Sequence, residues 1–193
     1  MGRDAGADAL LRLASAELRI TLPAICLMEA WSSFEDEQKR RNSFRQTLDT
    51  QISQLLRDVT SAHAKALVQH LQQARTENFD LLNDIRDRLR DVQEKLAGLQ
   101  AGFPAAEILP LTPSALATDL AAGPTKDPTD NLILAIIQEH ALQHPDEDKA
   151  FLSGNTHDFD TPEIRALLAD AGITDYFART DAFLGWLGTR NRP

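Results

Sequence analysis

Cysteine is nearly absent from this chain: Cys26 is the only one among 193 residues. A lone cysteine cannot close a disulfide within the chain, and no second cysteine joins it to form a zinc site. Long apolar runs are absent too, because no stretch approaches the roughly 18 uninterrupted apolar residues of a membrane span, and the N-terminus lacks the basic-then-apolar pattern of a secretory signal. These absences predict a cytoplasmic protein without a membrane segment.

Positive charge is also in short supply, since the net charge is −9 at neutral pH. This excess argues against a protein that coats nucleic acid by bulk attraction, which requires a basic surface. The charge is unevenly placed: between Glu35 and Lys95, 11 acidic residues balance 11 basic ones. The acidic excess therefore lies in the two flanking segments.

Glycine and proline are both missing between Ala24 and Ala97, and the strong helix formers found there predict helix throughout. A single helix of these 74 residues would be roughly 110 Å long, too long for a compact domain of this size. The apolar stripe that starts at Leu48 loses its phase near residues 75–80, and a second stripe starts at Leu82. We therefore expect an antiparallel helical hairpin, inserted at residues 44–101 of a single domain spanning 1–193. One long bent helix is the alternative.

Outside this segment, short apolar stretches alternate with helical patterns. The expected strands cover residues 18–21, 106–111, 149–153 and 175–179. Strands separated by helices indicate a parallel sheet covered by helices on both faces. The predicted fold class is α/β, a three-layer sandwich with a parallel central sheet and a long helical insertion.

The stretch FLSGNTHDFD, residues 151–160, follows the third expected strand. Ligands of such sheets bind beyond the carboxyl ends of the strands, and Ser153, Asn155 and Asp158 place oxygen atoms there. Oxygen-rich loops suit hard cations such as Mg²⁺ or Mn²⁺, while Phe159 could anchor the loop in the core. The alternative is an Asx-turn that simply ends a strand.

Two further acids, Glu29 and Asp130, are expected close to the same sheet edge. Glu29 lies early in the helix after the first strand, and Asp130 lies at the start of the helix that contains NLILAII. Asp127 or Thr129 is expected to cap that helix, so Asp130 would project from its first turn beside a buried face. A carboxylate in that position needs a partner, and a metal ion shared with Glu29 would serve.

In this order, these residues resemble the PIN-domain superfamily of metal-dependent ribonucleases. The similarity is to a PIN-like family with a long helical insertion, whose last motif reads Ser or Thr, any residue, Asn, two residues, Asp-Phe, and it covers about residues 8–34 and 105–188. The resemblance implies Mg²⁺- or Mn²⁺-assisted cleavage of RNA phosphodiester bonds. In it, Glu29 and Asp130 are metal ligands, Asp158 is a ligand or positions water, Asn155 stands where many relatives carry an acid, and Ser153 bonds a carboxylate or phosphate.

One departure concerns the first strand of the superfamily, which lies in the centre of the sheet and supplies the leading metal-binding Asp. It has no counterpart here, and the nearby acids Asp4 and Asp8 do not follow an apolar strand. The chain is therefore expected to be an N-terminally incomplete PIN-like domain, inactive as written if no other acid replaces that Asp. A non-catalytic interaction protein, whose helical arm mediates self-association or partner binding, is the alternative of a different class.

Overall fold

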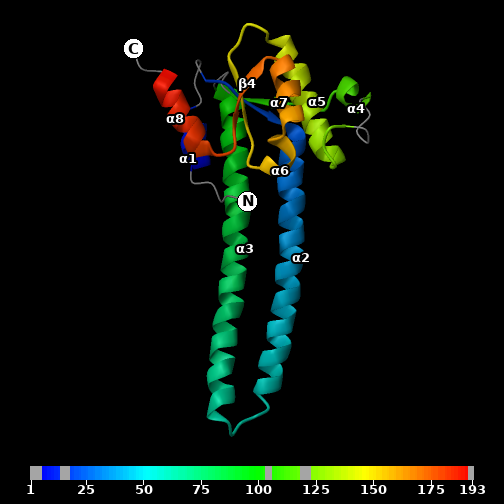
Figure 1. Cartoon of the computed structure of the whole chain (residues 1–193). Helices are drawn as coiled ribbons and strands as arrows, with labels where there is room; N and C mark the ends of the chain where they lie inside the picture. Colours follow the sequence, from blue (N-terminus) through cyan, green and yellow to red (C-terminus); the bar gives the residue numbers. More distant parts are fainter. Residues whose placement is uncertain (1–5, 14–17, 103–105, 118–122, 191–193) are drawn as a thin grey trace. The chain divides into compact units, whose positions relative to one another are not determined.

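The computed structural model describes residues 6–13, 18–102, 106–117 and 123–190 (Figure 1). The chain divides into two compact units. We call Met28–Glu94 the hairpin unit, and Arg3–Leu27 with Lys95–Pro193 the sheet unit. Each unit is described by itself.

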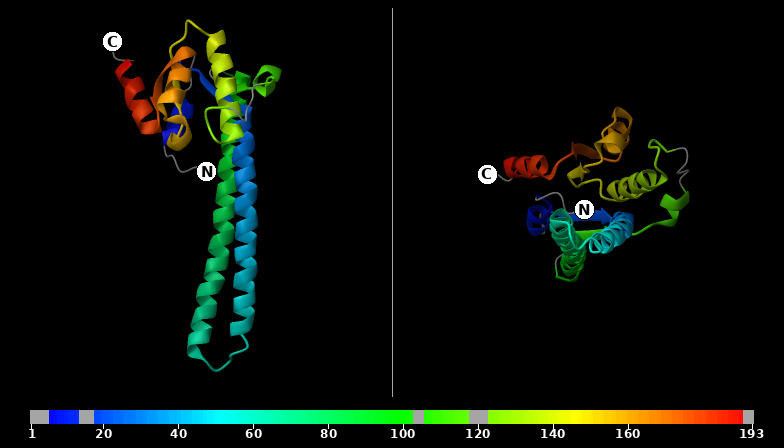
Figure 2. Two further views of the ribbon diagram at one scale, coloured as in Figure 1. Left: turned by 45° about the vertical axis from the view of Figure 1, so that its right-hand side comes forward. Right: turned by 90° about the horizontal axis from the view of Figure 1, so that it is seen from below.

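Two long helices form the hairpin unit: α2 spans Ala24–Leu55 and α3 spans Ala62–Gly102. They run antiparallel and side by side (Figures 1 and 2). Apolar residues spaced three or four apart face the seam between them, and the buried ones are Phe34, Leu48, Ile52, Ala64, Val68 and Leu82. None of the helices within the described ranges combines the length and apolarity needed to cross a membrane.

A polar layer interrupts this seam at Asn78, which is buried although its neighbours along the seam are apolar. Its Nδ2 donates to the carbonyl oxygen of Arg41 at 3.2 Å. The Arg41 Nε in turn donates to Glu37 Oε1 at 2.6 Å. A buried amide satisfied by one particular partner favours a single alignment of two packed helices.

The hairpin turns between Leu55 and Ala62, whereas the sequence pattern placed the turn near residues 75–80, which lie within α3. Asp58 Oδ1 accepts hydrogen bonds from the backbone N–H groups of Thr60 at 3.2 Å and Ser61 at 3.0 Å. Ser61 Oγ then accepts from the backbone N–H of Ala64 at 3.1 Å and so caps the start of α3. Side-chain hydrogen bonds therefore make this turn without glycine or proline.

Replacing Ser61 by Ala should destabilise the hairpin by about 1 kcal/mol, because the cap of α3 is lost. Ser61→Asp should retain the cap and most of the stability. Urea unfolding followed by far-UV circular dichroism measures the change. Ser53→Ala is the matched control, since Ser53 Oγ only donates to the Asp49 carbonyl within α2; an equal loss in both alanine variants would contradict a capping role.

The sheet unit contains two separate two-stranded parallel sheets. In the first, β1 (Ile20–Pro23) pairs with β2 (Ala106–Leu109); in the second, β3 (Lys149–Leu152) pairs with β4 (Ile173–Phe177). The helices of this unit are α1 (Gly6–Leu13), α4 (Pro113–Ala117), α5 (Pro128–Gln143), α6 (Thr156–Phe159), α7 (Pro162–Asp170) and α8 (Thr180–Arg190).

The predicted three-layer α/β sandwich with a central parallel sheet is therefore wrong. Helices make up most of the described residues, and no described strand pairs with more than one neighbour. A single sheet would require a strand bonded to both pairs. None of the strands in the described part of the chain bonds to both pairs, so the two sheets stay separate.

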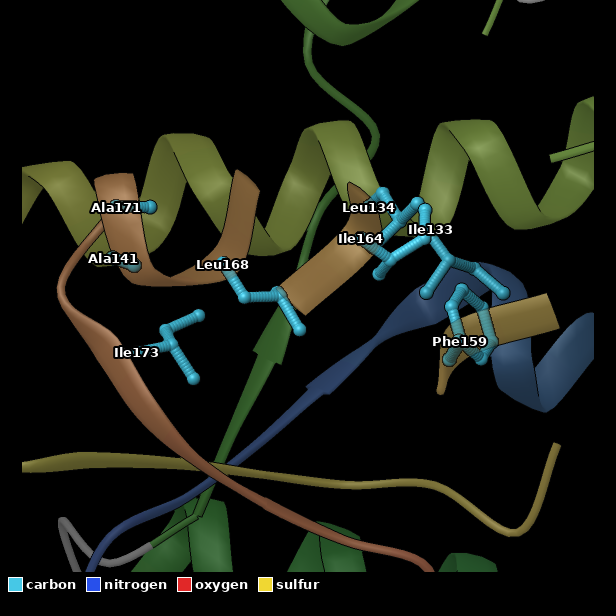
Figure 3. Close-up of a cluster of buried hydrophobic side chains, with 8 residues drawn as sticks. All are labelled: Ile133, Leu134, Ala141, Phe159, Ile164, Leu168, Ala171 and Ile173. Atoms are coloured by element: carbon cyan, nitrogen blue, oxygen red, sulfur yellow. The ribbon is translucent and has the colours of Figure 1, made fainter. Parts of the chain in front are cut away.

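Helix α5 supplies side chains to both cores of the sheet unit. Its Leu132 and Ile136 belong to one cluster with Leu109 of β2. Its other buried apolar residues join a larger cluster that also contains residues of α6, α7 and β4; the members are Ile133, Leu134, Ala141, Phe159, Ile164, Leu168, Ala171 and Ile173. Figure 3 shows Ile164 of α7 beside Ile133 and Leu134. Burying a side chain such as Ile164 contributes about 1.5–3 kcal/mol, so this packing stabilises the association of α5 with both clusters.

Candidate functional site

The first turn of α5 carries Asp130. Asp127, one of the two residues expected to cap the helix, is the N-cap, and its side chain accepts from the backbone N–H of Thr129 at 2.8 Å. Pro128 follows at the first helical position, where its fixed φ and missing N–H are tolerated. Asp130 is consequently held in the first turn, where it is half-buried.

Immediately before α5, buried hydrogen bonds between Thr125 and Asn131 hold the chain. Together with Gly123, which lies against the Asn131 amide, we call these residues the Asn131 clasp. Asn131 Oδ1 accepts from the Thr125 backbone N–H at 2.9 Å, and Asn131 Nδ2 donates to the Thr125 carbonyl at 2.9 Å. The single hydroxyl proton of Thr125 is shared between Asn131 Oδ1 at 2.8 Å and the Asp127 carbonyl at 2.9 Å. Asn131 is only 4% exposed, so these bonds lie in the interior.

The loop after β3 carries the other candidate residues. Ser153 N–H donates to the Phe177 carbonyl at 3.0 Å, and Ser153 Oγ accepts from the backbone N–H of Asn155 at 3.2 Å. Phe159 is buried in the larger apolar cluster, which confirms the expected anchor. Ser153 thus shapes the loop, while its predicted contact with a carboxylate or phosphate stays a prediction.

Asn155 connects this loop to the first turn of α5. It is the N-cap residue of α6, but its side chain makes no capping hydrogen bond. Instead, Asn155 Nδ2 donates to Asp130 Oδ2 at 3.2 Å, across 25 positions of sequence. Two of the candidate residues are therefore in direct contact.

Negative charge accumulates around this contact. The pKa of Asp130 is raised above its usual value of 3.8, first by burial and then by repulsion from Asp127 and Asp158, whereas the Asn155 hydrogen bond acts in the opposite direction. No lysine, arginine or histidine of the described chain forms an ion pair with Asp130 or Asp158. We call Asp127, Asp130, Asn155 and Asp158 the Asp130 cluster.

The remaining candidate acids belong to other helices or to undescribed residues. Glu29 is an exposed residue of α2 within the hairpin unit, so the Asp130 cluster is built from the sheet unit alone. Asp8 lies in α1, and Asp4 is outside the described residues. The predicted role of Glu29 as a metal ligand stays a prediction.

The donor atoms of the Asp130 cluster are of the kind that Mg²⁺ and Mn²⁺ take. Among the described residues, no group of three or more His, Cys, Asp or Glu is arranged to hold a metal ion. Mg²⁺, however, usually binds through one or two carboxylates and keeps several water ligands. Asp130 and Asp158, with the amide oxygen of Asn155, fit that less demanding requirement.

Sequence reasoning missed the Asn131 clasp. The signal was present in DNLILAII, where an asparagine precedes an unbroken apolar run and must share its buried environment. A buried amide requires hydrogen-bond partners, and the nearest polar segment is Gly123–Asp127. The partner could have been sought there.

Comparison with known proteins gives no match: no family model, no curated protein and no solved structure is found to be similar to this chain. The resemblance to the PIN-domain superfamily therefore stays a prediction from the sequence motifs.

Proposed function

We propose that the Asp130 cluster binds Mg²⁺ or Mn²⁺ and serves the hydrolysis of RNA phosphodiester bonds. The hydrogen bond between Asn155 and Asp130 carries this proposal, because it unites the loop after β3 with the first turn of α5. The carboxylates gathered there have no basic partner among the described residues, and a cation would relieve their repulsion. The reaction class comes from the PIN resemblance.

Each residue of the cluster has a separate task in this proposal. Asp130 and Asp158 hold the cation through carboxylate oxygens. Asn155 fixes the orientation of Asp130 through Nδ2 and offers its Oδ1 as a further oxygen donor to the cation. A bound divalent ion supplies stabilisation of charge on the phosphoryl oxygens and lowers the pKa of water.

Thermal unfolding of the full chain in Mn²⁺, Mg²⁺ or KCl of equal ionic strength tests cation binding. A ligand that binds only the folded state at about 100 times its Kd stabilises by about 2.7 kcal/mol. The melting temperature should therefore rise in either divalent salt and not in KCl, and Mn²⁺ should support cleavage of end-labelled single-stranded RNA. Equal melting temperatures in all three salts would rule out the site.

Self-association through the hairpin unit is a second candidate function. It is favoured by exposed apolar side chains on α2 and α3, namely Phe44 (46% exposed), Leu67 (47%), Phe79 (54%) and Leu81 (38%). Single exposed apolar residues are normal on a protein surface, and we infer an interaction site from the presence of four of them on these two helices.

Sedimentation equilibrium measures this association directly. The average mass of the wild-type protein should exceed the 21.4 kDa monomer and rise with concentration, whereas the double substitution Phe44→Ser and Leu67→Ser should give a monomer. Leu142→Ser, at an exposed position of α5 in the sheet unit, is the control and should leave the mass unchanged. A wild-type protein that stays monomeric throughout would contradict the idea.

A further inference from the structure

The first two turns of α5 are buried on almost every side. Asn131, Leu132, Ile133, Leu134 and Ile136 are all buried. A helix that is apolar all round gains similar burial in several rotations about its own axis, because no single stripe faces the core. Apolar packing alone therefore does not determine which way Asp130 points.

The Asn131 clasp supplies the missing constraint. Its hydrogen bonds tie one side chain of the first turn to the backbone of Thr125, and buried hydrogen bonds demand a specific geometry, unlike apolar contacts. Consecutive helical residues project about 100° apart. Once Asn131 is fixed in the interior, the direction of Asp130 follows, and Asp130 meets Asn155.

Gly123 makes the close approach of the loop possible. A Cβ atom on this residue would lie 2.2 Å from Asn131 Cγ and 2.4 Å from Asn131 Nδ2. The backbone of the loop therefore lies directly against the amide that it holds.

We propose that Thr125 and Asn131 are positioning residues of the Asp130 cluster: the clasp holds the first turn of α5 in the rotation that presents Asp130 to Asn155, and so sets the cation affinity. This inference rests on the proposed function for its consequence, but the positioning itself is a property of the metal-free protein. The two parts can be measured separately.

Thr125→Val and Thr125→Ser test the proposal. Valine has the shape of threonine but lacks the hydroxyl, whereas serine keeps it. Partners outside the ligand shell of a metal site typically change affinity by about 10- to 100-fold. Thr125→Val should weaken Mn²⁺ binding in titration calorimetry about tenfold and shift the NMR signals of the Asn155 side-chain amide in the metal-free protein. Thr125→Ser should stay within about twofold of the wild type and leave those signals in place.

The opposite results would overturn the proposal. Unmoved Asn155 signals in Thr125→Val refute a positioning role of the Thr125 hydroxyl, which donates to Asn131 Oδ1, and equal effects of both substitutions show that lost packing, not the hydroxyl, is responsible. If the valine variant does not fold, Thr125→Ala replaces it, because alanine also lacks the hydroxyl. If the wild-type protein binds no Mn²⁺, the proposed function fails, while the Asn155 signals still decide whether the clasp positions Asp130.

Discussion

Asp130→Asn is expected to abolish the stabilisation of the protein by Mn²⁺ and to lower Mn²⁺-dependent RNA cleavage at least about 100-fold. Asparagine keeps the size of aspartate and can still accept a hydrogen bond from Asn155 Nδ2, so the local structure should survive. What is lost is the negative charge that holds the cation. A 100-fold effect is a lower bound, because changing even a residue outside the ligand shell typically costs about 10- to 100-fold.

Without metal, the same substitution should raise the melting temperature at neutral pH. The pKa of Asp130 is raised from 3.8 by burial and by repulsion from Asp127 and Asp158, so the folded protein binds this proton more tightly than the unfolded chain. Ionising Asp130 therefore costs stability as the pH rises from about 3.8 through the raised pKa. The melting temperatures of the variant and the wild type should therefore be similar at pH values below about 3.8. Their difference should grow as the pH rises through the raised pKa of Asp130 and stay constant at higher pH.

Melting temperatures of both proteins, recorded from acidic to neutral pH with a chelator and again with Mn²⁺, test both effects. Asp170→Asn, which removes an exposed acid at the end of α7, is the control. It should change neither the stabilisation by Mn²⁺ nor the pH dependence of the melting temperature. A metal response that survives in Asp130→Asn would remove the basis of the proposed site. If Asp130→Asn is less stable than the wild type at neutral pH, the charge of Asp130 does not destabilise the folded state.

Gly123→Ala is expected to destabilise the folded protein by about 3 kcal/mol. The added Cβ would lie 2.2–2.5 Å from three atoms of the Asn131 amide, and that amide cannot move aside without breaking its bonds to Thr125. Overpacking typically costs about 1–3 kcal/mol, and a buried polar group left without a partner a further 1–3 kcal/mol. Chemical denaturation of the full chain measures the loss.

Two control measurements test whether the clash with Asn131 causes this loss of stability. Gly185→Ala changes a glycine of α8 whose added Cβ would meet nothing within 4 Å, and an alanine inside a helix should be neutral or stabilise by up to about 1 kcal/mol. In an Asn131→Ala background the clash disappears, so the cost of Gly123→Ala should fall sharply. An equal cost in both backgrounds would show that the strain has another source.

The helices were largely predictable because their signals are local. The absence of glycine and proline from Ala24 to Ala97 indicated α2 and α3, and the expected cap at Asp127 or Thr129 marked the start of α5. The turn was misplaced because Val59 continues the apolar stripe in sequence, although it is 70% exposed in the turn. Asp58 and Ser61 form that turn through their side-chain hydrogen bonds. In the sequence they do not differ from the other polar residues of the segment.

The sheet could not be predicted because strand pairing is not local. The four stretches near the expected positions do form strands in parallel pairs, but the number of strands in a sheet depends on partners that no single segment specifies. Similarly, the candidate residues at 130 and 155 were chosen from separate motifs, and only the fold brings them within 3.2 Å. Asn131 was overlooked because its role depends on the loop that it holds.

The Asn78 layer of the hairpin has a consequence for how this protein can vary over evolution. One residue inserted into α3 between Ala62 and Asn78 would rotate the following side chains by about 100° around the helix axis. The Asn78 amide would then point away from the Arg41 carbonyl. Exposed polar positions of the hairpin can thus accept substitutions freely, whereas insertions and deletions should be excluded unless both helices change length together in whole heptads. Natural variants of this segment should therefore differ in residue identity, while the number of residues between Arg41 and Asn78 stays constant or changes by matched heptads in both helices.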